Sequence, residues 1–195
     1  MLDGAIAIRS SKETTDSAPE DSALIRRIAH GDKDAFSVFL NRYLGAMVAF
    51  AQRYIGNRSD AEDIAQEAFT RVWTHADSWR ETGASPRSWL YRITYNLCID
   101  DLRKKRPLLE EHDLVSEDTP EKQLTQDIDE ATLRQTINAL PDRQRSAIWL
   151  SAYHGLSNKE ASEILGTTVE AMESLLTRAR RSLRERLQLD QQDNL

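Results

Sequence analysis

Residues 155–187 read GLSNKEASEILGTTVEAMESLLTRARRSLRERL, the clearest local pattern in the chain. Ser157 and Glu160 have the spacing of a capping box, which begins a short helix, and Gly166 can end that helix. Thr168 can cap a second, longer helix. The apolar positions of this helix recur every three or four residues: Met172, Leu176, Ala179, Leu183 and Leu187. The pattern predicts a helix-turn-helix, in which the second helix enters the major groove of DNA. A helical hairpin with a solvated charged face is the competing interpretation, and the zero net charge of residues 135–195 favours it.

The segment before this motif is also helical in pattern. Leu133, Ile137 and Leu140 share one face of a helix, and Pro141 can begin another that runs to His154 and ends at Gly155. With the helix-turn-helix, these segments predict a small helical domain over residues 128–190.

The first half of the chain shows a second set of helix boundaries. Gly31 ends a helix that starts near Ser22, Asp32 caps a long one reaching Ile55, and Gly56 ends it. Ser59-Asp60-Ala61-Glu62 is a capping-box pattern for a third helix. One face of that helix is apolar: Ala61, Ala65, Ala68, Phe69, Val72 and Trp73.

A fourth helix is predicted from Pro86 to Pro107. Proline suits the first turn of a helix but not its interior. We expect Leu90, Ile93 and Leu97 to point inward. The 195 residues include only seven glycines and five prolines, and alternating strand patterns are absent, so the fold class is all-α.

Charge divides the chain. The net charge is −6, but residues 23–106 are positive overall and residues 107–134 hold nine acidic against two basic residues. We predict two small helical domains joined by a flexible acidic linker: a disordered tail (1–20), a first domain (21–106), the linker (107–127) and the second domain (128–190).

Composition also argues against several classes of protein. Cys98 is the single cysteine and the four histidines form no zinc pattern, so we expect no metal and no cofactor. The chain has no apolar run long enough to span a bilayer and does not begin with a leader pattern, so we expect a cytoplasmic protein without membrane insertion. Asp60, Asp63 and Glu67 lack a nucleophile or phosphate loop, which argues against an enzyme.

Aromatic and basic residues interleave between residues 79 and 106. Unpaired bases stack on aromatic rings while cations hold the backbone, so this mixture suits melted DNA. Packing in the core is the competing interpretation for each aromatic taken alone. The residues are Trp79, Arg80, Arg87, Trp89, Tyr91, Arg92, Tyr95, Arg103, Lys104, Lys105 and Arg106.

Three stretches resemble the extracytoplasmic-function (ECF) sigma factors: AEDIAQEAFTRVW (61–73), SWLYRITYNLCIDDLRKKR (88–106) and residues 155–187. They occur in the order of that family and the resemblance covers residues 22–187. It implies a transcription initiation factor, active in a stress or signal response, that binds core RNA polymerase and promoter DNA. It also implies control by an anti-sigma factor.

The resemblance carries over to individual positions. It implies that the exposed face of the 61–73 helix binds core polymerase, through Asp63, Gln66, Glu67 and Thr70. It implies that the minus-ten element is read by the connector 79–85 and the helix after it, through Trp79, Arg80, Trp89, Arg92, Asn96, Arg103, Lys104, Lys105 and Arg106. It implies that the last helix reads the minus-35 element, through Thr168, Glu170, Ala171, Glu173, Ser174, Thr177, Arg178 and Arg181.

The start of the last helix departs from the family at two positions. The family usually carries a basic residue, Ser and Arg where this chain has Glu173, Ser174 and Leu175. A carboxylate repels phosphate, so Glu173 either points away from DNA, paired with an arginine such as Arg180, or accepts from a cytosine amino group.

Other functions remain open from the residues alone. A stand-alone helix-turn-helix regulator would explain residues 155–187, but it would leave the aromatic and basic cluster and the exposed carboxylates without a role. A decoy that binds only the inhibitor would be expected to lack the basic run Arg103–Arg106.

Overall fold

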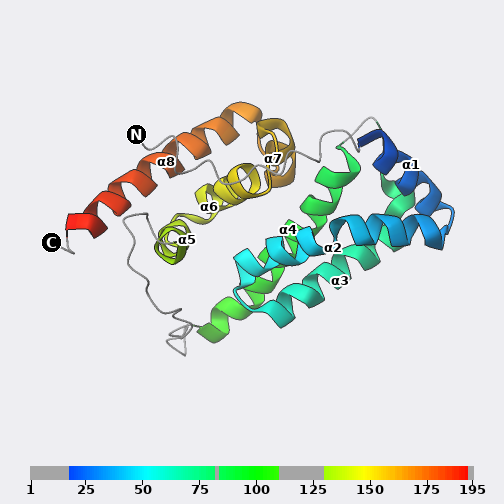
Figure 1. Ribbon diagram of the computed structural model, residues 1–195, viewed down its shortest axis with the longest axis horizontal. Helices are drawn as coiled ribbons and strands as arrows, with labels where there is room; N and C mark the ends of the chain where they lie inside the picture. Colours follow the sequence, from blue (N-terminus) through cyan, green and yellow to red (C-terminus); the bar gives the residue numbers. More distant parts are fainter. Residues whose placement is uncertain (1–17, 82–83, 110–129, 193–195) are drawn as a thin grey trace. The chain divides into compact units, whose positions relative to one another are not determined.

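The fold was obtained as a computed structural model, which describes residues 18–81, 84–109 and 130–192. Every regular element in these ranges is helical. The helices fall into two compact units, α1 to α4 and α5 to α8 (Figure 1). The fold class predicted from the sequence is therefore confirmed. In the described ranges, no helix is both long enough and apolar enough to cross a bilayer.

The first unit consists of α1 (Ala18–Ala29), α2 (Lys33–Ile55), α3 (Arg58–His75) and α4 (Pro86–Leu109), with a short 3-10 turn at Ala76–Ser78. The predicted boundaries of α2 are confirmed. The Asp32 carboxylate accepts from the backbone amides of Asp34 and Ala35, and Gly56 adopts φ +79° to end the helix.

The predicted start of α3 is wrong by two residues. Asn57 is the N-cap, because its side chain accepts from the amides of Ser59 and Asp60. Glu62, the predicted partner in the Ser59 capping box, instead forms an ion pair with Arg58 at 2.9 Å. Both Asn57 and Ser59 can cap a helix. Gly56 has a positive φ and ends α2, and the next residue, Asn57, is already the N-cap of α3.

Aromatic and aliphatic side chains from α2, α3 and α4 form the first core. α2 lies between the others and packs against all three helices (Figure 1). Phe39, Met47 and Phe50 of α2 are fully buried, and Phe50 meets Tyr91 of α4 edge to face at 5.2 Å. Burial of each such side chain is worth roughly 1.5–3 kcal/mol, so the apolar face of α2 organises the unit.

α1 is held to α2 by a polar cluster. Asp21 is buried and accepts from Tyr43 and, at 2.5 Å, from Arg42. Glu20 pairs with the same guanidinium at 3.2 Å. Residues 18–20, predicted to belong to the disordered tail, are thus helical, because Glu20 and Asp21 have a partner on α2 that local sequence does not reveal. Residues 1–17 lie outside the described residues.

α4 differs from its prediction at both its buried face and its end. Pro86 does begin the helix, and Ser85 caps it by accepting from the Ser88 amide at 3.1 Å. Tyr91, Thr94 and Cys98 are buried beside Leu90, whereas the predicted Ile93 and Leu97 are only half-buried.

The helix passes Pro107 and ends at Leu109, since a proline in the last turn removes only one helical hydrogen bond. Most of the predicted linker, residues 110–127, lies outside the described residues.

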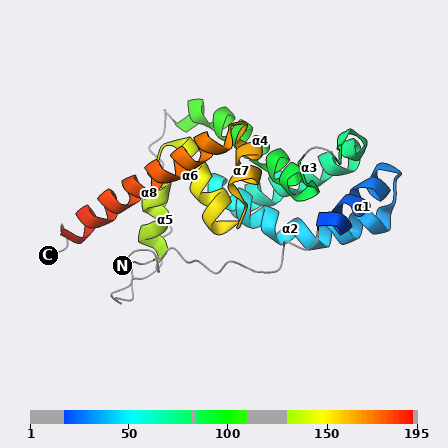
Figure 2. The ribbon, with the colours of Figure 1, turned by 90° about the horizontal axis from the view of Figure 1, so that it is seen from above.

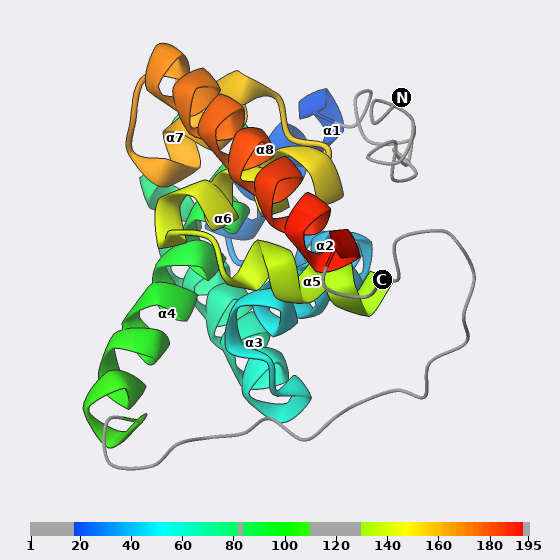
Figure 3. The ribbon, with the colours of Figure 1, turned by 90° about the vertical axis from the view of Figure 1, so that its left-hand side faces the viewer.

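The second unit consists of α5 (Glu130–Asn138), α6 (Asp142–Ile148), a π-helical turn (Trp149–Tyr153), α7 (Asn158–Leu165) and α8 (Val169–Gln192). The predicted helix from Pro141 to His154 is interrupted, because its last turn widens to π geometry around the buried Trp149. α8 packs against α6, α7 and α5 (Figure 3). Its buried face is Met172, Leu176, Ala179 and Leu183, with Leu187 half-buried, close to the prediction.

The predicted helix-turn-helix is present. Ser157 and Glu160 form the reciprocal capping box, and Gly166 ends α7 with φ +59°. The Thr168 hydroxyl accepts from the Ala171 amide at 3.2 Å to start α8. Arg143 of α6 donates to the Leu165 carbonyl at 3.3 Å, which ties the turn to the rest of the unit. Figure 2 shows α8 as the long last helix of this unit.

Candidate protein and nucleic-acid interfaces

The outer face of α3 presents a polar ridge, which we define as Asp63, Gln66, Glu67 and Thr70. All four are exposed because they lie opposite the buried Ala61, Ala65, Ala68 and Phe69. The Glu67 carboxylate pairs with Arg71 at 2.9 Å, and Thr70 donates to the Gln66 carbonyl. The structure thus brings the four residues predicted to bind polymerase onto one continuous face.

A shallow apolar hollow adjoins the C-terminal end of the ridge. It has a volume of about 260 Å³ and is lined by Lys33, Phe36, Thr70 and Trp73. Phe36 and Trp73 meet edge to face at 5.1 Å. Trp73 is only half-buried, although the sequence predicts it as part of the core stripe. A polar rim beside an apolar hollow is the usual anatomy of a protein interface.

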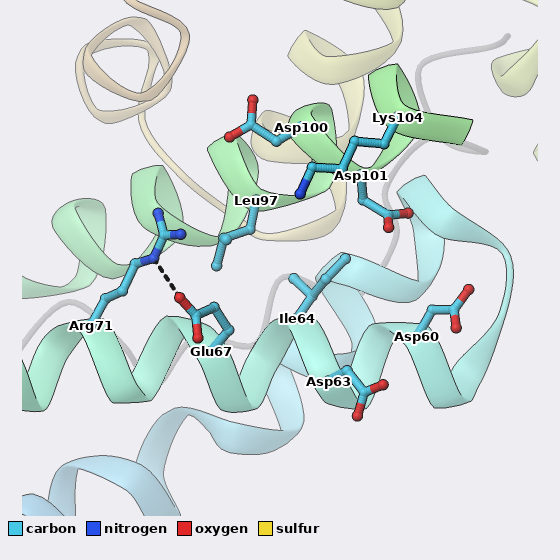
Figure 4. A pocket seen from close by; sticks show the side chains of 9 residues that line it. All are labelled: Asp60, Asp63, Ile64, Glu67, Arg71, Leu97, Asp100, Asp101 and Lys104. Atoms are coloured by element: carbon cyan, nitrogen blue, oxygen red, sulfur yellow. Dashed lines mark hydrogen bonds and ion pairs between the residues drawn. The ribbon is translucent and has the colours of Figure 1, made fainter. Parts of the chain in front are cut away.

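An open groove of about 250 Å³ separates α3 from α4 on the other side of the ridge. In Figure 4, Ile64 and Leu97 point toward each other across it, and Asp60, Glu67, Asp100 and Lys104 surround them. Glu67 therefore belongs to the ridge and also borders this groove.

Lys105 lies on the α3 side of α4. Its ammonium donates to Asp60 at 2.7 Å and to Asp101 at 2.8 Å. Hydrogen bonds to Asp101 and Asp60 raise the pKa of Lys105 above 10.5, its ordinary value. The structure therefore pairs Lys105 with two carboxylates on the α3 side of α4, whereas Arg92 and Arg103 are exposed.

A second face of α4 is open to solvent. Trp89, Arg92, Asn96 and Arg103 follow one another at intervals of three, four and seven residues, which keeps them on one side of a helix. Arg92, Asn96 and Arg103 are exposed and Trp89 is half-buried. We call these four residues the α4 face. Lys104 is exposed toward the α3 groove, and the Arg106 side chain lies outside the described residues.

Two of the aromatic residues predicted beside this face belong largely to the core. Tyr91 is buried against Phe50, and the Arg87 guanidinium lies 5.6 Å from the Tyr91 ring centroid. Tyr95 meets Tyr54 edge to face at 5.8 Å. The competing interpretation as packing residues is thus correct for Tyr91 and Tyr95.

The connector between α3 and α4 is braced by Trp79. Its indole N–H donates to the Ala84 carbonyl at 2.9 Å, across residues 82–83, which lie outside the described residues. The Arg80 guanidinium donates to the carbonyls of Asp77 at 2.5 Å and Trp79 at 3.2 Å. These bonds fix the two ends of the connector next to the start of the α4 face.

The start of α8 presents the predicted minus-35 residues. Glu170, Glu173, Ser174, Thr177, Arg178 and Arg181 are exposed, and Ala171 is half-buried. The hydroxyls of Ser174 and Thr177 donate to the carbonyls of Glu170 and Glu173. A backbone hydrogen bond and the Thr168 hydroxyl lower the pKa of Glu170, which lies in the first turn of α8.

Glu173 has a partner that the sequence analysis missed. Its Oε1 accepts from Nδ2 of Asn158, the first residue of α7, at 3.5 Å. Arg180, the predicted partner, is not the residue that the structure places against it. Asn158 directly follows Ser157, the N-cap of α7. Its place at the start of α7 is the feature of the sequence from which this contact could have been predicted.

Both units match models of known protein families. The sigma-70 region 2 model matches residues 39–107, and the sigma-70 region 4 model matches residues 130–183. The first match contains most of α2, the α3 ridge and the α4 face, and the second contains α7 and the start of α8.

Curated relatives span nearly the whole chain. The ECF RNA polymerase sigma factor SigW of Bacillus subtilis is 34% identical over 177 residues, which cover 84% of this chain and 94% of the relative. The RNA polymerase sigma-H factor of Pseudomonas aeruginosa is 30% identical over 185 residues, covering 87% and 94%.

Two solved structures are similar in fold. CnrH in complex with the cytosolic domain of CnrY matches with a TM-score of 0.67 and 29% identity, over 87% of this chain and 98% of that one. The sigma factor RpoE from Bartonella quintana, in complex with the anti-sigma factor NepR, gives 0.65 and 29%, over 82% and 99%.

Proposed function

Because the chain belongs to the ECF sigma factors of bacterial RNA polymerase, we propose that it binds core polymerase through the α3 ridge and directs the enzyme to promoters. It acts without a catalytic step of its own, in the cytoplasm, as part of a stress or signal response. The two units correspond to a region 2 domain (residues 21–106) and a region 4 domain (residues 128–190), joined by residues 107–127. The observation that carries the proposal is the α3 ridge, exposed in full on a unit that matches sigma region 2.

The α3 ridge suits a partner helix that carries basic residues. Its acceptors are the carboxylates of Asp63 and Glu67 and the amide of Gln66, with the hollow at Phe36 and Trp73 beside them. Charges at the rim of an interface set orientation and association rate, whereas apolar side chains that enter a hollow supply most of the affinity. Polymerase would therefore be oriented by the ridge and anchored at the hollow.

The α4 face suits the strand that is unpaired at the minus-ten element. Trp89 offers a ring surface, Asn96 offers donors and acceptors for a base edge, and Arg92 and Arg103 offer charge for phosphates. Trp79 holds the connector in place at the start of this face. In duplex DNA the base faces are stacked and inaccessible, so the α4 face can contact them only after the strands have opened.

The helix-turn-helix suits the duplex minus-35 element. The exposed start of α8 carries residues that can reach base edges, and Arg178 and Arg181 can contact phosphates. A stand-alone regulator built on this motif would not explain the match of the first unit to sigma region 2.

Control by an anti-sigma factor is part of the proposal. RpoE of Bartonella quintana was solved in complex with the anti-sigma factor NepR. The α3 ridge and the α4 face are both exposed, so a protein that covers them would block polymerase and promoter DNA together.

Charge reversal on the ridge tests the proposal. Glu67→Lys should abolish co-elution with core polymerase on gel filtration. Glu62→Lys is the matched control, because Glu62 also lies on α3, is similarly exposed and also pairs with an arginine at 2.9 Å. Each change disrupts a surface pair worth about 0–1 kcal/mol, so both variants should remain folded. Equal association of the two variants with core polymerase would contradict the proposal.

A further inference from the structure

We infer that Glu173, held by Asn158, makes this protein select promoters with a cytosine on the strand contacted by α8 in the upstream element. The inference rests on the proposed function, because it assumes that α8 enters the major groove. It concerns Glu173, an acidic residue exposed on the recognition helix.

Glu173 is placed to face the groove rather than the core. It lies in the second turn of α8, next to Ser174 and within one turn of Thr177, and all three are exposed. The core side of the helix is occupied by Met172 and Leu176. A side chain at this position of a helix-turn-helix reaches base edges.

Asn158 contacts the carboxylate at 3.5 Å. Its Nδ2 donates to Oε1 of Glu173, a contact between the first residue of α7 and the second turn of α8. A glutamate side chain loses conformational entropy when it is ordered, and an existing partner reduces that cost at the moment of binding. The contact leaves Oε2 to accept from DNA.

The chemistry of a carboxylate selects the base. An ionised carboxylate only accepts hydrogen bonds, and it is repelled by phosphates. The major groove offers two donors, the amino groups of cytosine and adenine. Adenine places its N7 acceptor beside its amino group, whereas cytosine carries no acceptor of its own at that edge, so cytosine is the better partner.

The other acidic residue of this helix start has a different role. Glu170 lies in the first turn of α8, where a backbone hydrogen bond and the Thr168 hydroxyl lower the pKa of its carboxyl. Of these two acidic side chains, Glu173 is the one placed to accept from a base.

A specificity switch tests the inference. Holoenzyme made from core polymerase and the full chain would be selected on promoters with a randomised upstream element. Wild type should favour cytosine at one position by roughly 5- to 150-fold over the other bases. Glu173→Ala should lose this preference. Glu173→Gln should shift it to adenine, because a glutamine amide can pair with N6 and N7 together.

Two further variants distinguish a base contact by Glu173 from two other effects: the positioning of Glu173 by Asn158, and the general effect of a negative charge near the DNA. Asn158→Ala should weaken the preference for cytosine while leaving the salt dependence of binding unchanged. Glu163→Gln, which removes a carboxylate from α7, is the matched control and should keep the wild-type preference. Tighter binding of both Glu173 variants to every promoter, with the base preference intact, would overturn the inference, because it would show simple repulsion of phosphate.

The outcome is separable from that of the proposed function. If wild-type holoenzyme forms and initiates but no base preference changes with Glu173, the inference fails and the sigma factor function stands. If no holoenzyme forms, the proposed function itself fails.

Discussion

The substitution Lys105→Met tests whether the ion pairs of Lys105 position the basic C-terminal part of α4 for DNA binding. The sequence groups Lys105 with the DNA-binding cations, but its ammonium donates to Asp60 and Asp101 at 2.7 and 2.8 Å. The methionine keeps an unbranched side chain of similar length and removes both ion pairs. We expect lower affinity for promoter DNA, because the end of α4 that carries Arg103 is then less firmly held to α3.

The expected loss of stability follows from the solvent exposure of the paired side chains. The Lys105 side chain is 38% exposed, and Asp60 and Asp101 are 40% and 28% exposed. Pairs this close to solvent are worth about 0–1 kcal/mol each, so the free energy of unfolding should fall by about 1 kcal/mol. The raised pKa of Lys105 means that this stabilisation is fully present below pH 10.5 and is lost only as the pH rises through the higher folded value.

The assay is the salt dependence of holoenzyme binding to a forked promoter, followed by fluorescence anisotropy. Each phosphate contact contributes about 0.7 to 0.9 to the slope of log affinity against log salt. Arg103→Ala should reduce the slope by that amount, whereas Lys105→Met should lower affinity with no change in slope. Arg134→Met, at an exposed arginine of α5 outside the proposed interfaces, controls for the loss of one positive charge. A slope reduced by Lys105→Met as much as by Arg103→Ala would refute the positioning role.

Three more predictions follow from buried or bonded groups. Trp79→Phe keeps a ring but removes the hydrogen bond to the Ala84 carbonyl, so permanganate reactivity at the minus-ten element should fall; reactivity at the wild-type level would show that stacking alone matters. Asp21→Ala removes the buried carboxylate that accepts from Tyr43 and Arg42, although Arg42 keeps its pair with Glu20, and should destabilise the protein by about 1–3 kcal/mol in urea unfolding; an unchanged midpoint would mean that this cluster contributes little to the fold. Burial raises the pKa of the Cys98 thiol to about 12, so iodoacetamide at pH 8 should label it only after unfolding; rapid labelling of the native protein would contradict its burial.

Local signals account for the parts of the fold that the sequence predicts well. Asp32, Gly56, the capping box at Ser157 and the turn at Gly166 act within a few residues of chain, so their effect can be identified without tertiary information. The apolar positions of α8 were predicted for the same reason, because a helix of fixed period must bury one face.

Tertiary contacts account for the differences. Tyr91 and Thr94 are buried because α2 packs on that side of α4, and Lys105 is drawn toward α3 by Asp60, 45 positions earlier in the chain. The π-helical turn at Trp149–Tyr153, which contains the buried Trp149 and Leu150, has no signal in the local sequence. Among the candidate site residues, exposure on one face was predictable from helical spacing. The partner of Glu173 was not, because Asn158 lies on another helix, and the bond from Trp79 to Ala84 was not, because it depends on the irregular path of the connector.

The most direct test of the central claim is run-off transcription by purified core polymerase on a pool of genomic fragments, with and without this chain. The account predicts new start sites that require the chain, share an upstream and a minus-ten sequence, and disappear with Glu67→Lys but persist with Glu62→Lys. Association with core polymerase that yields no chain-dependent start site, or start sites that are unaffected by Glu67→Lys, would contradict it.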